Sequence, residues 1–247
     1  MHDYSLGNPF IELQSVDSTN NYALGRIHAK LAQPGTCYFA HHQTKGKGQY
    51  GKTWISEKSS NIVLSIVIIP EFLNVLQQFY LSACTATAVH DFFSNYAGSE
   101  TKIKWPNDIY WQDKKAGGIL IDNIIINQSW SWSVIGVGIN INQTEFPNDL
   151  KNPVSLKEIT GKKFEVIKLA KELCGSLDHF YKLLKEEGFK TIFETYRQCL
   201  YKKGEKVRLR KRNQVLQAII KDVTESGQIV IEHAFEELVN PGEIEWA

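Results

Sequence analysis

The sequence lacks an excess of charge of either sign. Its 28 Lys and Arg residues nearly balance its 27 Asp and Glu residues, which gives a formal net charge of +1 at pH 7. No global field therefore drives the chain toward nucleic acid or a membrane surface. Hydrophobic residues make up 43% and charged residues 22%, as in ordinary globular proteins. The 247 residues suffice for one large domain, or for one large and one small domain.

Cysteine is scarce, and its spacing excludes two kinds of cross-link. The four cysteines form no C-x-x-C pair and lie far apart, at Cys37, Cys84, Cys174 and Cys199. This spacing predicts neither a disulfide framework nor a structural metal site, and four reduced thiols indicate a cytoplasmic protein. A secretory leader, which is basic and then apolar, is missing from the first ten residues. The longest apolar run, at 62–70, is far too short to span a membrane.

The apolar pattern predicts a chain in which helices and strands are interspersed. Helices are expected at 21–31, 75–96, 166–184 and 192–200, where apolar residues recur at helical spacing or follow capping residues. Strands are expected at 37–41, 61–70, 102–105, 119–126 and 130–141. Near residue 202 the pattern changes to short alternating strands with turn signals, which suits a small β-barrel. We therefore expect a catalytic domain over residues 1–200 and a small C-terminal domain over residues 201–247.

Residues 46–53 read GKGQYGKT and match the phosphate-loop pattern G-x-x-x-x-G-K-[ST]. A working phosphate loop needs a helix that starts at its Lys-Thr pair, because the helix N-terminus is part of the phosphate site. Here a loop and then a β-branched strand follow, which argues against a P-loop nucleoside triphosphatase. The glycines still allow close backbone approach, and Lys45, Lys47 and Lys52 surround them with positive charge. The alternatives are a ligand-binding loop and a solvated hairpin.

Four segments carry a more specific signal. They are Ser18-Thr19-Asn20, QTKGKGQYGKTW from Gln43 to Trp54, KWPND at 104–108 with KAGGIL from Lys115, and IGVGIN ending at Asn140. In order and spacing they resemble the catalytic domain of biotin protein ligases, the enzymes that attach biotin to carboxylase carrier domains. The most specific pair is KWPND with the lysine-glycine segment seven residues later. The similarity covers roughly residues 10–200, and the tail resembles the family's SH3-like C-terminal domain only loosely.

The resemblance implies both a fold and a reaction. The fold is α+β: a catalytic domain of the class II synthetase-like or biotin–lipoate ligase-like type, with a central mixed β-sheet flanked by helices, and a small SH3-like β-barrel. In the reaction, ATP activates biotin to biotinyl-5′-AMP, and a lysine of a biotin carboxyl carrier protein then takes the biotin. The resemblance thus implies ATP, Mg²⁺ and biotin as ligands, and we expect no structural metal.

The resemblance also implies roles for individual residues. Lys115 matches the family's catalytic lysine, which lies between the carboxylate and the α-phosphate, where one preorganised donor is worth roughly 3–4 kcal/mol. The residues expected to bind biotin are Ser18, Thr19, Asn20, Gln43, Lys47, Gly48, Gln49, Lys115, Gly118 and Gly136. Those expected at the nucleotide are Lys47, Lys52, Trp54, Asn107, Asp108 and Asn140, with Asp108 also as a ligand of Mg²⁺.

Each assignment has a structural alternative. Lys115 would otherwise be a solvated turn lysine, and Trp54 a core residue. The segment 18–20 would otherwise be only a helix cap. The resemblance also implies that the backbone at four glycines touches the ligand, and these would otherwise serve only tight strand packing: Gly117, Gly118, Gly136 and Gly138.

The loop departs from the family pattern at Gln49. An arginine of the family motif stands at that position, and Lys47 and Lys52 replace two others. Lysine keeps the charge but loses the bidentate guanidinium, whereas Gln49 loses the charge altogether. We hypothesise weaker retention of biotinyl-AMP, or compensation by Lys45 or Lys52.

Several rival interpretations remain. Lipoate ligases and octanoyltransferases share the fold, but their R-R-x-x-G-G-G-x-V-Y-H signature is absent from the sequence. The run 202–212 holds seven basic residues and one acidic residue, which fits a charged strand face, a surface for an acidic carrier domain, or an RNA-binding module. Only 17 residues precede Ser18, so we expect no N-terminal DNA-binding domain and no repressor role. We expect no membrane partner, and a homodimer is left open.

Overall fold

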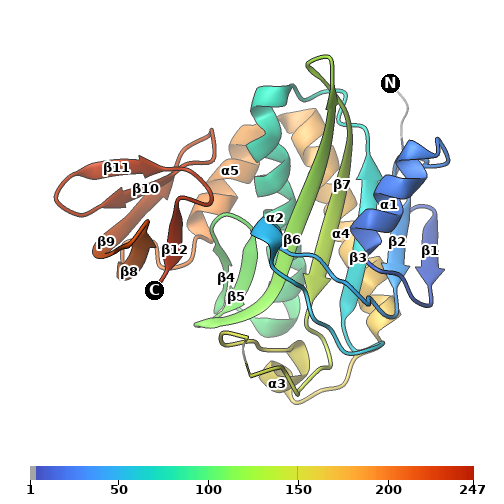
Figure 1. Cartoon of the computed structure of the whole chain (residues 1–247), viewed down its shortest axis with the longest axis horizontal. Helices are drawn as coiled ribbons and strands as arrows, with labels where there is room; N and C mark the ends of the chain where they lie inside the picture. The colour runs from blue at the N-terminus through green and yellow to red at the C-terminus, as the bar shows by residue number, and fades with distance from the viewer. Residues whose placement is uncertain (1–3, 149) are drawn as a thin grey trace.

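The computed structural model describes residues 4–148 and 150–247. Two sheets organise the chain: a seven-stranded sheet of order β1-β2-β3-β7-β6-β5-β4, and a five-stranded sheet of order β11-β10-β9-β8-β12 (Figure 1). The strands of the large sheet are β1 (Phe10–Leu13), β2 (Cys37–Ala40), β3 (Ile62–Ile68), β4 (Thr101–Lys104), β5 (Asp108–Trp111), β6 (Lys114–Ile126) and β7 (Ser129–Ile139). Only its β1–β2 pair is parallel among the described strands, so this sheet is mixed. The predicted α+β class with a central mixed sheet is confirmed.

Helices lie on both faces of the large sheet. They are α1 (Thr19–His28), α2 (Gln78–Ala97), α3 (Leu156–Thr160), α4 (Val166–Glu187) and α5 (Phe189–Gln198), with short 3₁₀ turns η1 (Gln49–Gly51) and η2 (Val75–Gln77). The main hydrophobic core forms on the face that α2 and α4 cover. On the opposite face, α1 packs over β2, β3 and β7, and the segment between β2 and β3 crosses in front of β6 and β7 (Figure 1). This second face, beyond α1, is therefore lined by loop rather than by helix.

The core-forming elements follow from their apolar patterns. All seven residues of β3 are buried, because this central strand is covered on both faces. In α4 the buried residues recur at helical spacing, as predicted, and they face α2 and the sheet. Within the described residues, no helix combines the length and the apolar character needed to cross a membrane.

Several boundaries differ from the sequence expectation. Helix α1 begins at Thr19 rather than at residue 21, so Asn20 also lies in its first turn. Strand β6 begins at Lys114 rather than at residue 119, because this polar stretch pairs with β5 through a tight turn at Gln112, whose φ is 50°. Strands β1 and β5 and helix α3, of four or five residues each, were not predicted.

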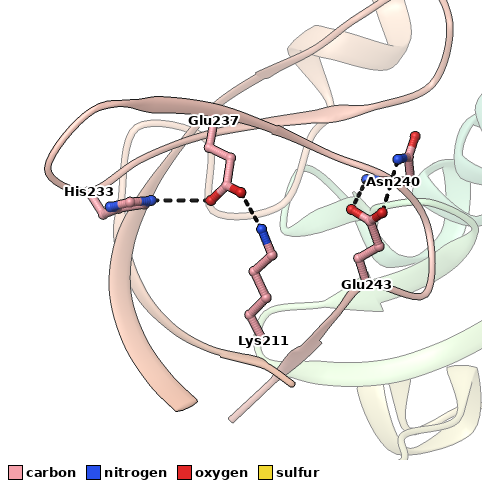
Figure 2. A network of polar contacts seen from close by, with 5 residues as sticks. All are labelled: Lys211, His233, Glu237, Asn240 and Glu243. Atoms are coloured by element: carbon pink, nitrogen blue, oxygen red, sulfur yellow. Dashed lines mark hydrogen bonds and ion pairs between the residues drawn. The ribbon is translucent and has the colours of Figure 1, made fainter. Parts of the chain in front are cut away.

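The C-terminal sheet consists of β8 (Lys206–Lys211), β9 (Gln214–Val223), β10 (Ile229–Glu232), β11 (Glu236–Val239) and β12 (Ile244–Trp246), all antiparallel. Figure 2 shows polar contacts within it. Glu237 accepts hydrogen bonds from Lys211 and from His233, and Glu243 accepts from the backbone and side-chain amides of Asn240 at 3.0 and 3.1 Å. The bonds between Asn240 and Glu243 fix the turn that leads into β12. The two sheets share one continuous hydrophobic core, and the division into domains at residues 200 and 201 stays a prediction.

Candidate active site

A buried polar cluster joins α1 to the large sheet. The backbone N–H and the hydroxyl of Thr19 both donate to Gln43 Oε1, at 2.7 and 3.1 Å. The Ser65 hydroxyl lies 2.7 Å from Thr19 Oγ1 and 2.6 Å from Asn20 Oδ1. The Asn20 amide in turn donates to Asp122 Oδ2 at 2.8 Å. Three of the predicted biotin-binding residues are thus brought together, and Ser65 and Asp122 join them although neither was among the predicted site residues.

Gly136 makes room for this cluster. It lies opposite Ser65 in the β3–β7 pair, and a Cβ at Gly136 would lie only 2.1 Å from Asn20 Oδ1. A glycine is therefore required if Asn20 is to reach the sheet. Ser18 is buried at the N-cap of α1, but its side chain makes no capping hydrogen bond. A helix cap therefore does not account for the segment 18–20.

A second feature is a row of residues across the open face of the sheet. Gly138, Gly118, Asp108 and Lys104 lie directly opposite one another on β7, β6, β5 and β4. Opposite residues of antiparallel strands project to the same face, and neighbouring strands are about 4.8 Å apart. The row from Gly138 to Lys104 therefore spans three strand spacings, about 14 Å. The Trp54 ring lies on Gly138, where a Cβ would be 2.5 Å from Cε2.

Lys115 and Asp108 form an ion pair in the middle of this row. Lys115 Nζ lies 2.7 Å from Asp108 Oδ1, and the two side chains are 34% and 25% exposed. A Cβ at Gly118 would lie 3.3 Å from Asp108 Oδ1 and 3.5 Å from Lys115 Nζ, and glycine leaves the space beside the ion pair free of a side chain. Lys115 belongs to β6, and its backbone N–H donates to Asn152, so the solvated-turn alternative is wrong. A half-buried ammonium of this kind, with one carboxylate neighbour, is suited to an incoming anion.

The segment 46–53 closes on itself as a hairpin. Gly48 N donates to Lys52 O at 2.7 Å, and Trp54 N donates to Gly46 O at 3.0 Å. The next regular element along the chain is strand β3, so the P-loop interpretation is wrong. The Lys47 ammonium donates to Asn21 on α1, which holds the hairpin beside the polar cluster.

The other predicted site residues lie in different settings. Asn107 donates to the carbonyl of Ile119, and buried Asn140 donates to the carbonyls of Val154 at 3.2 Å and Lys115 at 3.5 Å. Both amides thus hold backbone next to the Lys115 strand. Gln49 and Lys52 lie at the tip of the hairpin, where Lys52 is exposed. Of the groups that the structure describes, no set of three His, Cys, Asp or Glu side chains could hold a metal ion.

Lys104, at the end of the row, is a further charged residue on this face. The sequence analysis named it only as part of the KWPND motif. Its Nζ lies 3.0 Å from the Tyr110 hydroxyl, and burial lowers its pKa to about 8. Asp108 opposes this fall in pKa, whereas Lys115 and Lys52 add to it. The four residues lie close enough together to act on one another through their charges.

The fold and the site define the class of protein. The model of the biotin/lipoate A/B protein ligase family matches residues 12–140, just over half of the chain, and the chain belongs to this family. The resemblance inferred from the sequence motifs is thereby confirmed.

Two curated relatives and one solved structure show how far the similarity extends. The bifunctional ligase/repressor BirA of Bacillus spizizenii is 30% identical over 189 residues, covering 74% of this chain and 58% of that protein. Biotin–protein ligase 2 of Arabidopsis thaliana is 32% identical over 200 residues, covering 76% and 59%. The chain thus spans little more than half the length of these curated relatives. The structure of biotin protein ligase from Aquifex aeolicus in complex with biotin and ATP matches with a TM-score of 0.79 and 28% identity, covering 96% of this chain and 98% of that chain.

Proposed function

We propose that the protein is a biotin–[biotin carboxyl-carrier protein] ligase. It activates biotin with ATP to form biotinyl-5′-AMP and then transfers the biotin to a lysine of a carrier protein. The observation that carries this proposal is the placement of the α1 polar cluster beside the Lys115–Asp108 pair on one glycine-floored face. The similarity to a ligase whose structure contains biotin and ATP supports it.

The polar cluster suits the ureido ring of biotin, which offers two N–H donors and one carbonyl acceptor. Asn20 and Gln43 carry both donors and acceptors, and the hydroxyls of Thr19 and Ser65 can serve in either role. Thr19, Asn20 and Ser65 are buried, Gln43 is partly buried, and the groups are already bonded to one another, so their positions are fixed before a ligand arrives. Gly136 leaves the space above them free of a side chain.

The first chemical step joins two anions. A carboxylate oxygen of biotin attacks the α-phosphorus of ATP, the bond to the bridging oxygen breaks, and pyrophosphate leaves with that electron pair. The Lys115 ammonium lies where it reduces the repulsion between carboxylate and phosphate, and Asp108 holds it in place before the reaction. The Trp54 ring, seated on Gly138, offers a flat apolar wall for the adenine.

In the second step, the neutral amine of the carrier lysine attacks the acyl carbon of biotinyl-AMP. The bond to the phosphate oxygen breaks, AMP leaves with the electron pair, and the attacking nitrogen loses one proton. Mg²⁺ commonly binds through one or two carboxylates together with substrate phosphates, and Asp108 would supply such a carboxylate on this face. The metal would reduce the negative charge of the triphosphate.

The partner in this proposal is a biotin carboxyl carrier protein. A relative from Mycobacterium tuberculosis, 31% identical over 129 residues, carries the name biotin–[acetyl-CoA-carboxylase] ligase, which supports a carboxylase partner. The four free thiols suit the reducing cytoplasm, where we place the protein. The lack of a DNA-binding role and the possible homodimer stay predictions from the sequence.

The direct test is exchange of labelled pyrophosphate into ATP, driven by biotin, lipoate or octanoate. Of the three acids, we expect only biotin to drive the exchange. Biotin should then be transferred to an added carrier domain. Exchange with lipoate or octanoate instead would favour the alternative activity of this fold. The Lys115→Ala variant should lose exchange and keep the thermal unfolding midpoint of the parent, because its ammonium is only half-buried.

A further inference from the structure

Lys104 is held between aromatic rings from separate parts of the chain. Its Nζ lies 4.3 Å from the ring centre of Tyr110, 4.7 Å from that of Trp246 and 5.7 Å from that of Tyr201. Tyr110 belongs to β5, Tyr201 follows α5, and Trp246 belongs to β12 of the C-terminal sheet. The faces of aromatic rings attract cations, so these rings hold the ammonium in one place. We call this arrangement the Lys104 cage.

The surroundings of the cage carry more positive than negative charge. Lys52, Lys115 and Lys151 all lie close enough to Lys104 to lower its pKa, and the charge of Lys104 in turn lowers the pKa of Asp113. The carboxylate that raises the pKa of Lys104 is Asp108. That carboxylate is already bonded to Lys115 at 2.7 Å. Ammonium groups therefore outnumber carboxylates around Lys104, an arrangement that is unfavourable until a multiply charged anion joins it.

The row across the sheet indicates which anion fits. The adenine wall, Trp54, lies at one end of the row on Gly138, and the Lys115–Asp108 pair lies in the middle. Lys104 ends the row, about 14 Å from Gly138. A base, an α-phosphate and the outer phosphates of one nucleotide follow one another in the same order.

We propose that Lys104 is a second phosphate-binding cation of the site, which binds the β- and γ-phosphates of ATP and then the departing pyrophosphate. In this role Lys104 forms ionic hydrogen bonds and exchanges no proton; the pyrophosphate leaves with the electron pair of the broken P–O bond. The inference rests on the proposed function, since it assigns a part of the same adenylation step.

Trp246 is the positioning residue in this arrangement. It lies opposite Leu209 in the β8–β12 pair, and its ring lies 5.4 Å from that of Tyr201. The turn before β12 is fixed by the contact between Asn240 and Glu243 (Figure 2), and β12 lies beside β4 and β5 (Figure 1). The C-terminal sheet thereby holds a cation that belongs to the large sheet.

The test uses charge removal at Lys104 on the whole chain. Lys104→Met keeps the apolar stem, and Lys114→Met removes one charge from an exposed side chain of strand β6 as a matched control. We expect Lys104→Met to raise the KM for ATP in biotin-dependent exchange, and the Kd for pyrophosphate by calorimetry, roughly 10- to 100-fold. Lys104→Arg should keep most of the pyrophosphate affinity, and Lys114→Met should match the parent.

Preformed biotinyl-5′-AMP separates this role from a general loss of structure, because it lacks the outer phosphates. Lys104→Met should transfer biotin from it to a carrier domain at the rate of the parent. Trp246→Leu should raise the KM for ATP as Lys104→Met does, whereas Trp246→Phe should restore it. Unchanged pyrophosphate affinity in Lys104→Met, or an equal loss of transfer from biotinyl-AMP, would overturn the inference. If the parent shows no biotin-dependent exchange, the proposed function fails, and the pyrophosphate titration still tests Lys104.

Discussion

Gly136 offers the sharpest test of the polar cluster as the biotin pocket. In Gly136→Ala, the new Cβ would lie 2.1 Å from Asn20 Oδ1, against about 3.4 Å for an ordinary contact, so the amide must retreat by about 1.3 Å. That shift breaks the bonds of Asn20 to Ser65 at 2.6 Å and to Asp122 at 2.8 Å. A misplacement of about 1 Å at a binding group commonly costs roughly 100-fold in rate, and overpacking costs roughly 1–3 kcal/mol of stability.

We therefore expect Gly136→Ala to raise the KM for biotin roughly 100-fold in pyrophosphate exchange, with little change in the KM for ATP. Its unfolding midpoint should fall by roughly 2–4 °C for each kcal/mol lost. Gly25→Ala is the matched control, since Gly25 is exposed on the same helix as Asn20 and a Cβ added there would meet no neighbouring side chain within 4 Å. Alanine there should leave the KM unchanged and raise stability by roughly 0.5–1 kcal/mol. A Gly136→Ala enzyme with the parent's KM for biotin would refute the assignment of the pocket.

Three further predictions concern other parts of the molecule. Ser65→Ala leaves Thr19 and Asn20 short of a partner and should raise the KM for biotin roughly tenfold in the exchange assay, with Ser65→Thr less affected; equal KM values would contradict this. Gln49→Arg should slow release of biotinyl-AMP, measured by trapping the free intermediate, and no difference from the parent would sink the loop hypothesis. Burial alone would raise the pKa of Asp222, but hydrogen bonds, chiefly from Arg197, lower it to about 2. The ionised carboxylate thus stabilises the fold above pH 3.8 and loses this effect as the pH falls toward 2, so the deficit in melting temperature of Asp222→Asn should shrink over that range; a constant deficit would count against it.

The motifs assigned Asp108 and Lys115 to one site, although the ion pair between them was not predicted, and their geometry is local. Asp108 and Lys115 are seven residues apart on two strands joined by a tight turn, so the spacing itself brings them together. Strand β5, of four residues, was not predicted. The general order of helices and strands followed from apolar spacing, which burial on one face of the sheet enforces.

Residues whose roles depend on distant partners were missed. Ser65 is a single polar residue within a buried apolar strand, and its meaning comes from Asn20 on α1 and Gly136 on β7. The placement of Asn140 at the nucleotide stays a prediction, and the bonds of its amide to the backbone carbonyls of Lys115 and Val154 are contacts that no local pattern encodes. Pairings of this kind arise only once the sheet has formed. They could therefore not be predicted from the sequence alone.

The Lys104 cage also bears on how far the parts of this chain can be exchanged. The family match ends at residue 140, whereas two of the three rings, Tyr201 and Trp246, lie beyond it. A chimera that joined residues 1–200 to the C-terminal sheet of another family member would keep every recognised motif but would lose the Trp246 ring unless the donor supplied one. Its response to ATP would then differ although its biotin pocket was untouched. Conversely, changes confined to the C-terminal sheet would suffice to retune nucleotide use without altering a single motif residue.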